Sequence, residues 1–431
     1  MSLFRNKALL IFLSTLSCLS CERTEETPGR HHSLPCVEID IDENYLWSPD
    51  SGLYVIGRNG IPSNCMLGFA ANYNQKWEYP ATFRFYPEGL DESVIENQVG
   101  FRIKGNCSRE KAMKSVGLYW RSEYGSAYAE YPFFPDLGIG TFKRLLLRNS
   151  GNDFGLTHMK DAAMAEIIKE YARVEYASYR PVILYLNQEY WGIHNLREML
   201  TPHHFSCHYG VDEDLVDLLG GSPLAPYADD GSADTFLSEV IDYVKTHDLA
   251  EDEYYHHLAQ LIDMENLMDY FIIETYTMNR DWPLSNMKWW REDRTDGAYN
   301  KWKWILYDLD AAFAPENLQT VWIGDLIGDD HRANKEDGFF LLNQLIRNEA
   351  FTGEFIGRYM FFLDTVYDPD RVEKIIREMM DRLQEEYPAH SNKWHTLKPQ
   401  DWKRAVEDMI EWNRQRNRIM KELITPLYEA V

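Results

Sequence analysis

Positive charge is scarce in this chain. Its 44 Lys and Arg residues face 69 Asp and Glu residues, which gives a formal net charge of −25. Such a charge repels phosphates before any contact forms, so the sequence argues against a general nucleic-acid-binding protein. It also argues against charge-driven adhesion to anionic lipids. Binding of a nucleotide stays possible, because a local basic pocket with a metal ion can overcome the repulsion that the net negative charge exerts on phosphates.

Cysteine is also scarce, with six residues in 431. The four that follow the N-terminal region, Cys36, Cys65, Cys107 and Cys207, are too sparse for a disulfide framework in a chain of this size. None of these four shows the C-x-x-C spacing of a metal site. We therefore expect free thiols or a single pair.

Long apolar runs are absent outside the N-terminus. There, residues 8–19 follow Arg5 and Lys7 and end in small residues before Cys21. The run is too short to span a bilayer, and the pattern is typical of an export signal. We predict a signal peptide over 1–20, lipidation of Cys21 (or of Cys18), and a flexible polar tether over 21–40. Simple secretion and an N-terminal core helix are the alternatives.

The remaining chain changes pattern near residue 200. Before it, strand-like runs are separated by turn residues, with one helix over 157–172 and a hairpin of 180–186 and 190–197. The other predicted strands are 52–57, 81–86, 100–105, 115–120 and 142–147. After it, apolar positions three and four apart predict helices at 234–247, 251–262, 264–278, 338–348, 351–367, 371–387 and 401–423. One hairpin, 286–291 with 301–308, interrupts them.

This order predicts an α+β protein of kinase-like, two-lobed plan. The β-rich N-lobe would lie within 41–200 and the helical C-lobe within 201–431. We find no internal repeat and no low-complexity tract. Order alone is a modest argument for function, because one fold can host many activities.

Two acidic motifs could carry phosphoryl transfer. Asp281 precedes Asn286 by five positions, which matches the D-x-x-x-x-N spacing of the kinase catalytic loop. The predicted hairpin that follows ends in Asp308 and Asp310, where carboxylates at a cleft edge could bind a hard cation. Each motif also has a plain interpretation: Asp281 as a turn residue, and Asp308 with Asp310 as a solvated strand end.

A basic turn lies between two predicted strands of the β-rich half. It holds Lys104, Arg109 and Lys114 among small residues, and such a turn can fold over a polyphosphate. It is neither a Walker loop nor a G-x-G-x-x-G loop, and an exposed basic hairpin turn is the alternative. Glu166, in the middle of the predicted helix, could pair with a phosphate-binding cation, or it could be a surface charge.

A third group of residues allows a metal site. His204 and His208 share one helix face at i, i+4, with Cys207 beside them, and such a group could bind zinc. No H-E-x-x-H arrangement accompanies them, so a structural histidine pair is the preferred interpretation. The 13 Trp and 27 Tyr residues mostly fall at strand or helix spacing and are interpreted as core rather than as a carbohydrate surface.

Several of these segments together resemble the CotH (spore coat protein H) kinase family. The resembling segments lie in the same order along the chain, from Trp47 to Phe313: 47–54, 78–81, 103–109, 114–115, 124–125, 186–192, 197–198, 279–286 and 304–310. The resemblance implies an atypical protein kinase that transfers phosphate from ATP to Ser or Thr of an envelope or secreted protein, with Mg²⁺. It also implies placement at the envelope of a Gram-negative bacterium, at the outer membrane or surface.

Residue roles follow from the same resemblance. Asp281 would be the catalytic carboxylate, and Asn286, Asp308 and Asp310 would bind the metal. The cofactor-binding residues would be Lys104, Arg109, Lys114, Glu166 and Glu198. Lys104 stands where the family usually has Arg, which keeps the charge but loses the bidentate fork. A non-catalytic surface lipoprotein with a kinase-like scaffold for protein or glycan binding is the alternative function.

Overall fold

The computed structural model describes residues 32–65, 68–283, 285–322 and 337–430. The predicted signal peptide, Cys18, Cys21 and most of the predicted tether lie outside these ranges. Within them, no helix has both the length and the apolar character needed to cross a membrane.

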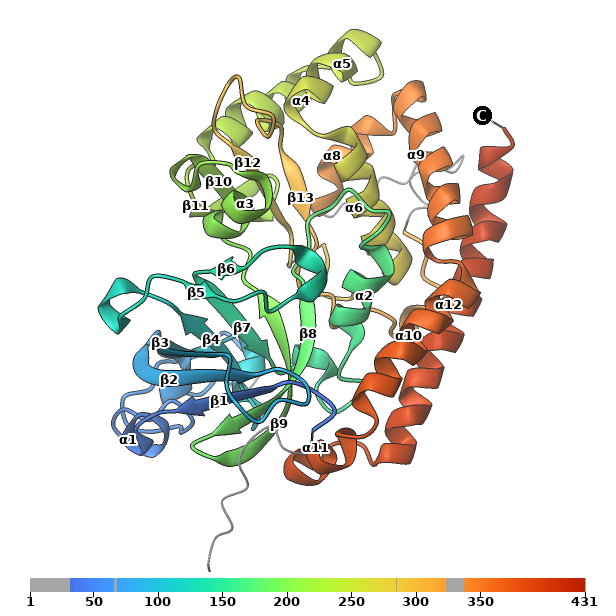
Figure 1. Ribbon diagram of the computed structural model, residues 1–431. Helices are drawn as coiled ribbons and strands as arrows, with labels where there is room; N and C mark the ends of the chain where they lie inside the picture. Colours follow the sequence, from blue (N-terminus) through green and yellow to red (C-terminus); the bar gives the residue numbers. More distant parts are fainter. Residues whose placement is uncertain (1–31, 66–67, 284, 323–336, 431) are drawn as a thin grey trace, which may run out of the picture.

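Seven strands of the first half close into a barrel (Figure 1). In order around the barrel they are β1 (Cys36–Asp40), β2 (Tyr79–Tyr86), β3 (Ile95–Lys104), β4 (Ser115–Tyr119), β7 (Arg144–Arg148), β9 (Glu189–Glu198) and β8 (Tyr179–Leu186). All neighbours are antiparallel except β1 and β8, which are parallel. A small separate sheet pairs β5 (Ala129–Glu130) with β6 (Thr141–Phe142).

Alternation of apolar residues explains the barrel. In six of the seven barrel strands, all but β9, alternate side chains belong to one buried cluster, as Phe83 and Phe85 do in β2 and Leu145 and Leu147 in β7. Side chains at i and i+2 share one face of a strand, so a single apolar face closes on itself. The hairpin predicted at 180–197 is confirmed as β8 and β9, and the strands predicted from residue 81 onward are confirmed in position.

Two predictions for the N-terminal part are wrong. Residues 52–57 form turns and bends rather than a strand, because Gly52 packs directly on the backbone of Ser48 and Leu46. The segment Cys36–Asp40, which we assigned to the tether over 21–40, is β1. Its Val37 and Ile39 are fully buried in the barrel core, and a five-residue strand leaves little trace in a sequence.

The second half is mainly helical, as predicted. Among the described residues its helices are α3 (Pro202–Tyr209), α4 (Asp242–Thr246), α5 (Asp252–Leu261), α6 (Met264–Thr277), α8 (Phe340–Leu345), α9 (Glu349–Phe361), α10 (Pro369–Leu383), α11 (Tyr387–Trp394) and α12 (Pro399–Tyr428). Two helices are extended by π-helical turns, Phe236–Ile241 before α4 and Phe362–Val366 after α9. The chain is therefore a mixed α and β protein.

A four-stranded sheet inside the helical half differs from the prediction of one hairpin. Its order is β11 (Ala225–Asp230), β10 (Val216–Ser222), β12 (Lys288–Glu292) and β13 (Lys303–Ile305). The predicted hairpin corresponds to β12 and β13. Strand β10 was not predicted. Five consecutive residues from Val216 are buried, so its sequence lacks the alternation of apolar and polar residues that marks a half-exposed strand.

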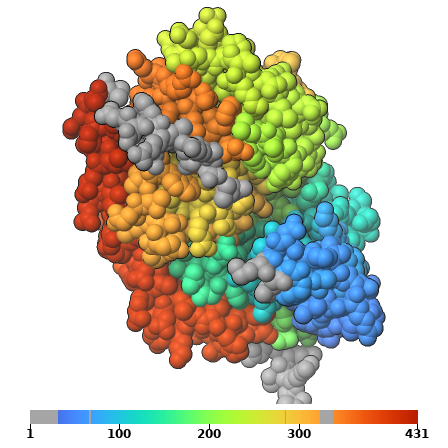
Figure 2. Space-filling view, turned by 180° about the vertical axis from the view of Figure 1, so that it is seen from behind, coloured from blue at the N-terminus to red at the C-terminus, as the bar shows by residue number. Residues whose placement is uncertain are grey.

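The helical half packs closely against the barrel. Helix α2 (Lys160–Ile168), the shorter form of the predicted helix, lies between them with α10 and α12 alongside (Figure 1). At the foot of these helices, Trp394 donates from Nε1 to the carbonyl of Trp191 (2.9 Å). Seen from behind, the blue-to-cyan residues and the yellow-to-red residues meet over a broad area (Figure 2). The two halves thus hold one another in place.

Candidate functional site

Helix α6 delivers the segment that contains Asp281. Every residue of the helix except Glu265 is buried, and the helix ends at Thr277, followed by Met278, which has a left-handed backbone. Trp282 is buried, and its indole donates to the hydroxyl of Tyr270 at 2.8 Å. With Trp282 fixed inside, its neighbour Asp281 stays partly exposed at the surface of the fold. The local sequence therefore presents this carboxylate outward.

Asp308 and Asp310 follow strand β13. Arg148, at the end of β7, forms an ion pair with Asp308 and donates to Oδ2 of Asp310 at 2.6 Å. The side-chain amide of Asn286 donates to the carbonyl of Asp308 at 3.5 Å. Asp308 has φ +63°, an uncommon backbone for a residue other than glycine. The structure thus brings Asn286, Asp308 and Asp310 together, as the spacing suggested.

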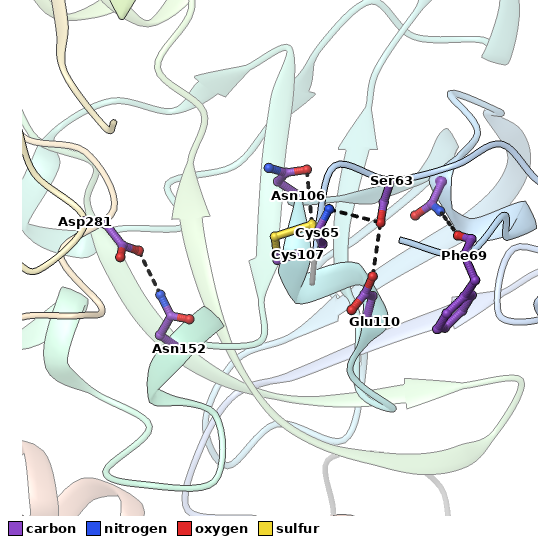
Figure 3. Close-up of a disulfide and its surroundings, with 9 residues drawn as sticks. Ser63, Cys65, Phe69, Asn106, Cys107, Glu110, Asn152 and Asp281 are labelled. Carbon is purple, nitrogen blue, oxygen red and sulfur yellow. Dashed lines mark hydrogen bonds between the residues drawn. A yellow bond between two sulfur atoms is a disulfide. The ribbon is translucent and has the colours of Figure 1, made fainter. Parts of the chain in front are cut away.

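Asn152 connects these carboxylates to Asp281. Its side-chain amide donates to Asp281 Oδ2 at 3.1 Å (Figure 3) and to Asp310 Oδ1 at 3.0 Å. Its backbone N–H donates to Asp310 Oδ2 at 3.0 Å. The neighbouring Gly151 has φ +53°, and a Cβ there would lie 1.8 Å from the same oxygen. Only glycine lets the chain approach Asp310 this closely.

Burial governs the electrostatics of Asp310. The side chain is only 3% exposed. The pKa of Asp310 is raised to about 8, mainly by burial and secondly by the charge of Asp308. Arg148 opposes this shift. A carboxylate pair of this kind favours sharing a cation or a proton.

A cavity of about 390 Å³ opens beside Asp308, between the barrel and the β10–β13 sheet. Its lining contains more cationic than anionic side chains. The cationic residues are Arg102, Lys104, Arg121, Arg144, Arg148, Arg197 and Lys288; the anionic ones are Asp161, Glu198, Asp229, Asp230 and Asp308. Apolar side chains line the rest, including those of Leu146, Met199, Leu200, Leu218 and Leu306.

The positive charge in this cavity is not fully balanced. Among the residues that the structure describes, no carboxylate pairs with Arg102, Lys104 or Arg144. The pKa of Lys104 is lowered to about 8, mainly by burial and secondly by the neighbouring cations. In a protein of net charge −25, such a cluster marks a place where an anion would be stabilised.

The comparison with known protein families now adds to this geometry. Residues 101–420 match the family described as CotH kinase protein, which is more than half of the chain. The chain belongs to the CotH kinase family. No curated protein matches it. The CotH match begins within β3 and includes the four barrel strands that follow it in the chain, the Asp281 and Asp308 segments, and nearly all of the helical half.

The residues predicted to bind the cofactor in this CotH chain are divided by the structure. Lys104 and Glu198 line the cavity, whereas Arg109, Lys114 and Glu166 do not. Glu166 pairs with Lys169, the residue that directly follows α2, at 2.7 Å. The acidic residue of α2 that does reach the cavity is Asp161, which forms ion pairs with Arg148 and Arg197.

Lys114 and Arg109 hold the basic turn itself. Lys114 is 3% exposed, and its ammonium donates to the carbonyls of Arg109 (2.6 Å) and Lys111 (3.0 Å). It also lies 4.0 Å from the ring centre of Tyr73. Arg109 donates to the carbonyl of Asn74 at 2.9 Å. Both cations donate to backbone carbonyls, and Lys114 also packs on the Tyr73 ring. These contacts fix the conformation of the turn.

A disulfide between Cys65 and Cys107 fixes the same turn to the preceding loop (Figure 3). Ser63 supports the connection by donating to Glu110 at 3.1 Å. Of the two outcomes expected for the cysteines, free thiols or a single pair, the structure shows the pair. The sequence analysis did not identify Arg148, Gly151, Asn152 or Asp161 as site residues. The sequence feature that could have pointed to this region is the Asn149-Ser150-Gly151-Asn152 turn, which comes shortly after a predicted strand.

Proposed function

We propose that this CotH chain is a phosphotransferase that moves a phosphoryl group from ATP to Ser or Thr of an envelope or secreted protein. One observation carries the proposal: Asp281, Asn286, Asp308 and Asp310 lie together, and Asp308 lines a cavity rich in cationic side chains. Their convergence supports a kinase-like plan, with the barrel as N-lobe, the helical half as C-lobe and the cavity between them.

The donor atoms fit the proposed metal. Asp308, Asp310 and Asn286 offer carboxylate and amide oxygens, which Mg²⁺ prefers. These residues would hold the ion at the cavity edge, where its positive charge would help to neutralise the phosphates. Arg148 would release Asp308 and turn toward the phosphates, where its planar guanidinium can form paired hydrogen bonds.

The cavity also fits a nucleotide. Its apolar lining at Leu200 and Leu218 offers a surface for a base, while Lys104, Arg102 and Arg144 supply charge for phosphates. Asp281 lies outside this lining but is held by Asn152, in contact with Asp310. A carboxylate there would orient an acceptor hydroxyl and receive its proton.

A kinase-like scaffold without catalysis is the second candidate, and one observation favours it. Arg148 pairs with both Asp308 and Asp310, so part of the negative charge of the proposed metal ligands is already compensated. Such a chain would use the fold to bind a protein or glycan. It would keep its function in an Asp308→Asn variant.

Transfer of label from γ-labelled ATP with Mg²⁺ separates the two candidates. We expect label on the chain or on a generic protein acceptor, and its loss in Asp308→Asn. Asp364→Asn is the matched control, since this exposed carboxylate pairs with Lys421 at 2.7 Å, far along the chain from the site. Absence of label, together with no thermal stabilisation by Mg-ATP, would refute phosphotransfer and favour the scaffold.

We also propose export and lipid anchoring through Cys21. Metabolic labelling with a radioactive fatty acid tests this, and Cys21→Ser should abolish the label while Cys207→Ser should not. Label that persists in Cys21→Ser and disappears in Cys18→Ser would move the anchor to Cys18.

A further inference from the structure

A second cluster of ligand-type side chains lies where α3 meets the barrel. His204 and His208 project from one face of α3, and their ring centres are 4.0 Å apart. Two carboxylates face them: Glu198 at the end of β9, and Glu175 in the segment before β8. None of the four residues belongs to the Asp308 cluster.

Direct contacts join the four side chains. His204 Nε2 lies 2.8 Å from Glu175 Oε1, and His204 Nδ1 lies 3.2 Å from Glu198 Oε1. The same oxygen of Glu198 lies 2.8 Å from His208 Nε2. One ligand atom from each of Glu175, His204 and His208 falls within 4.8 Å of the other two. The cluster is nearly closed to solvent, since Glu175, Glu198 and His204 are each at most 8% exposed.

Outer hydrogen bonds orient both carboxylates. Tyr209 donates its hydroxyl to Glu175 Oε2, and the backbone N–H of Ser178 donates to Glu198 Oε2 at 3.1 Å. Each carboxylate therefore has one oxygen held from behind and the other turned toward the histidines. Metal centres commonly orient their ligands through such outer partners.

Charge counting indicates a cation. Two buried carboxylates carry −2, and neutral imidazoles leave that charge uncompensated, which is costly in a buried site. Protons on the histidines can balance it, and so can one divalent ion bound to the same lone pairs. Ligands at about 2.0–2.2 Å from Zn²⁺ lie roughly 3–4 Å from one another, so the cluster needs only a small rearrangement of these side chains.

We propose that Glu175, His204 and His208 form a binding site for a divalent transition-metal ion, with Zn²⁺ the best match. Mixed nitrogen and oxygen donors suit zinc, whereas Mg²⁺ prefers the all-oxygen donors of the Asp308 cluster. Glu198 would accept a hydrogen bond from a ligating imidazole or complete the coordination.

The place of this site suggests its effect. The carbonyl of Glu175 accepts from the N–H of Leu306 at 2.8 Å, two residues before Asp308. Glu198 lines the cavity itself. A bound ion would fix α3, β9 and the Glu175 segment to one another, and so would stiffen the wall of the cavity without touching the reacting groups.

Metal titration of the purified full-length chain tests the proposal. After chelator treatment, Co²⁺ should bind with a stoichiometry of about one and give the visible absorption bands of a low-coordinate site. Addition of Zn²⁺ should then displace the Co²⁺ and remove these bands. His208→Gln should weaken Zn²⁺ binding by more than the roughly 10–100-fold that loss of an outer partner costs. Asp308→Asn should leave it unchanged.

The matched control is His203→Gln, on the same helix. His203 contacts Glu213 at 2.8 Å and has no place in the cluster, so its loss should leave Zn²⁺ affinity unchanged. Equal weakening in His203→Gln and His208→Gln, or no saturable binding by the wild-type chain, would overturn the proposal. X-ray absorption of the Zn²⁺-loaded wild type needs no variant to fold: it should show imidazole scattering, and its absence would be equally decisive.

Discussion

The Cys65–Cys107 disulfide allows a quantitative test of how the basic turn is held. The two residues are 42 positions apart, so the bond closes a loop of that length in the unfolded chain. The chain-entropy relation for a loop of this size gives an entropy loss of about 13 cal/mol/K on cross-linking, or about 4 kcal/mol at 25 °C. The double variant Cys65→Ser/Cys107→Ser should therefore be less stable by about 4 kcal/mol.

Urea unfolding under oxidising and reducing conditions measures this difference. The wild type should lose about 4 kcal/mol when reductant is added, whereas the double variant should be insensitive to reductant. Cys207→Ser is the control and should keep the full response, because Cys207 is outside the disulfide. An equal effect of reductant on the wild type and on the double variant would show that the reasoning is wrong.

Three further predictions concern single residues. Gly151→Ala should cost about 1–2 kcal/mol for its left-handed backbone, and should also displace Asp310 and abolish Mg²⁺-dependent label transfer. Arg416→Met should lower the free energy of unfolding by roughly 3 kcal/mol or more, because the buried guanidinium donates to four carbonyls, two of them in the last turn of α6. The pKa of His194 is lowered to about 3, mainly by burial and secondly by the neighbouring His158. Since the unfolded chain takes up this proton below about pH 6.5, His194 reduces stability as the pH falls from 6.5 toward 3, and His194→Asn should flatten that dependence by about 1.4 kcal/mol per pH unit.

Each of these predictions has a matched control. Gly138 also has positive φ but open space around it, so Gly138→Ala should cost stability without loss of transfer. The exposed Arg414→Met should change unfolding by less than about 1 kcal/mol. His256 is exposed, and His256→Asn should leave the pH slope unchanged. The Gly151 prediction fails if Gly138→Ala loses label transfer as well, or if Gly151→Ala keeps it. The Arg416 prediction fails if Arg416→Met and Arg414→Met unfold alike in urea, and the His194 prediction fails if His194→Asn and His256→Asn show the same pH slope.

Local sequence patterns were enough to find the acidic half of the site. Asp281, Asn286, Asp308 and Asp310 lie within one stretch whose helix, turn and hairpin can be recognised from spacing. The order of strands and helices was also readable, because strongly periodic segments retain their type in the fold.

The cationic half depended on long-range packing that no local pattern records. Arg148 meets Asp308 across 160 positions of sequence. Lys114 looked like a phosphate ligand, but its ammonium turns inward because the turn's carbonyls and the ring of Tyr73 surround it. Glu166 and Asp161 lie on one helix, and only the packing of α2 decides which of them reaches the cavity.

Closure of the barrel by β1 has a consequence for solubility. Strand β1 hydrogen-bonds on one side to β2 and on the other to β8, so the barrel has no unpaired edge. Exposed strand edges are templates for aggregation between chains. Removing Cys36–Asp40 would therefore open two such edges at once. The short segment nearest the proposed lipid anchor is thus also the one that keeps neighbouring copies of the barrel from adhering to each other.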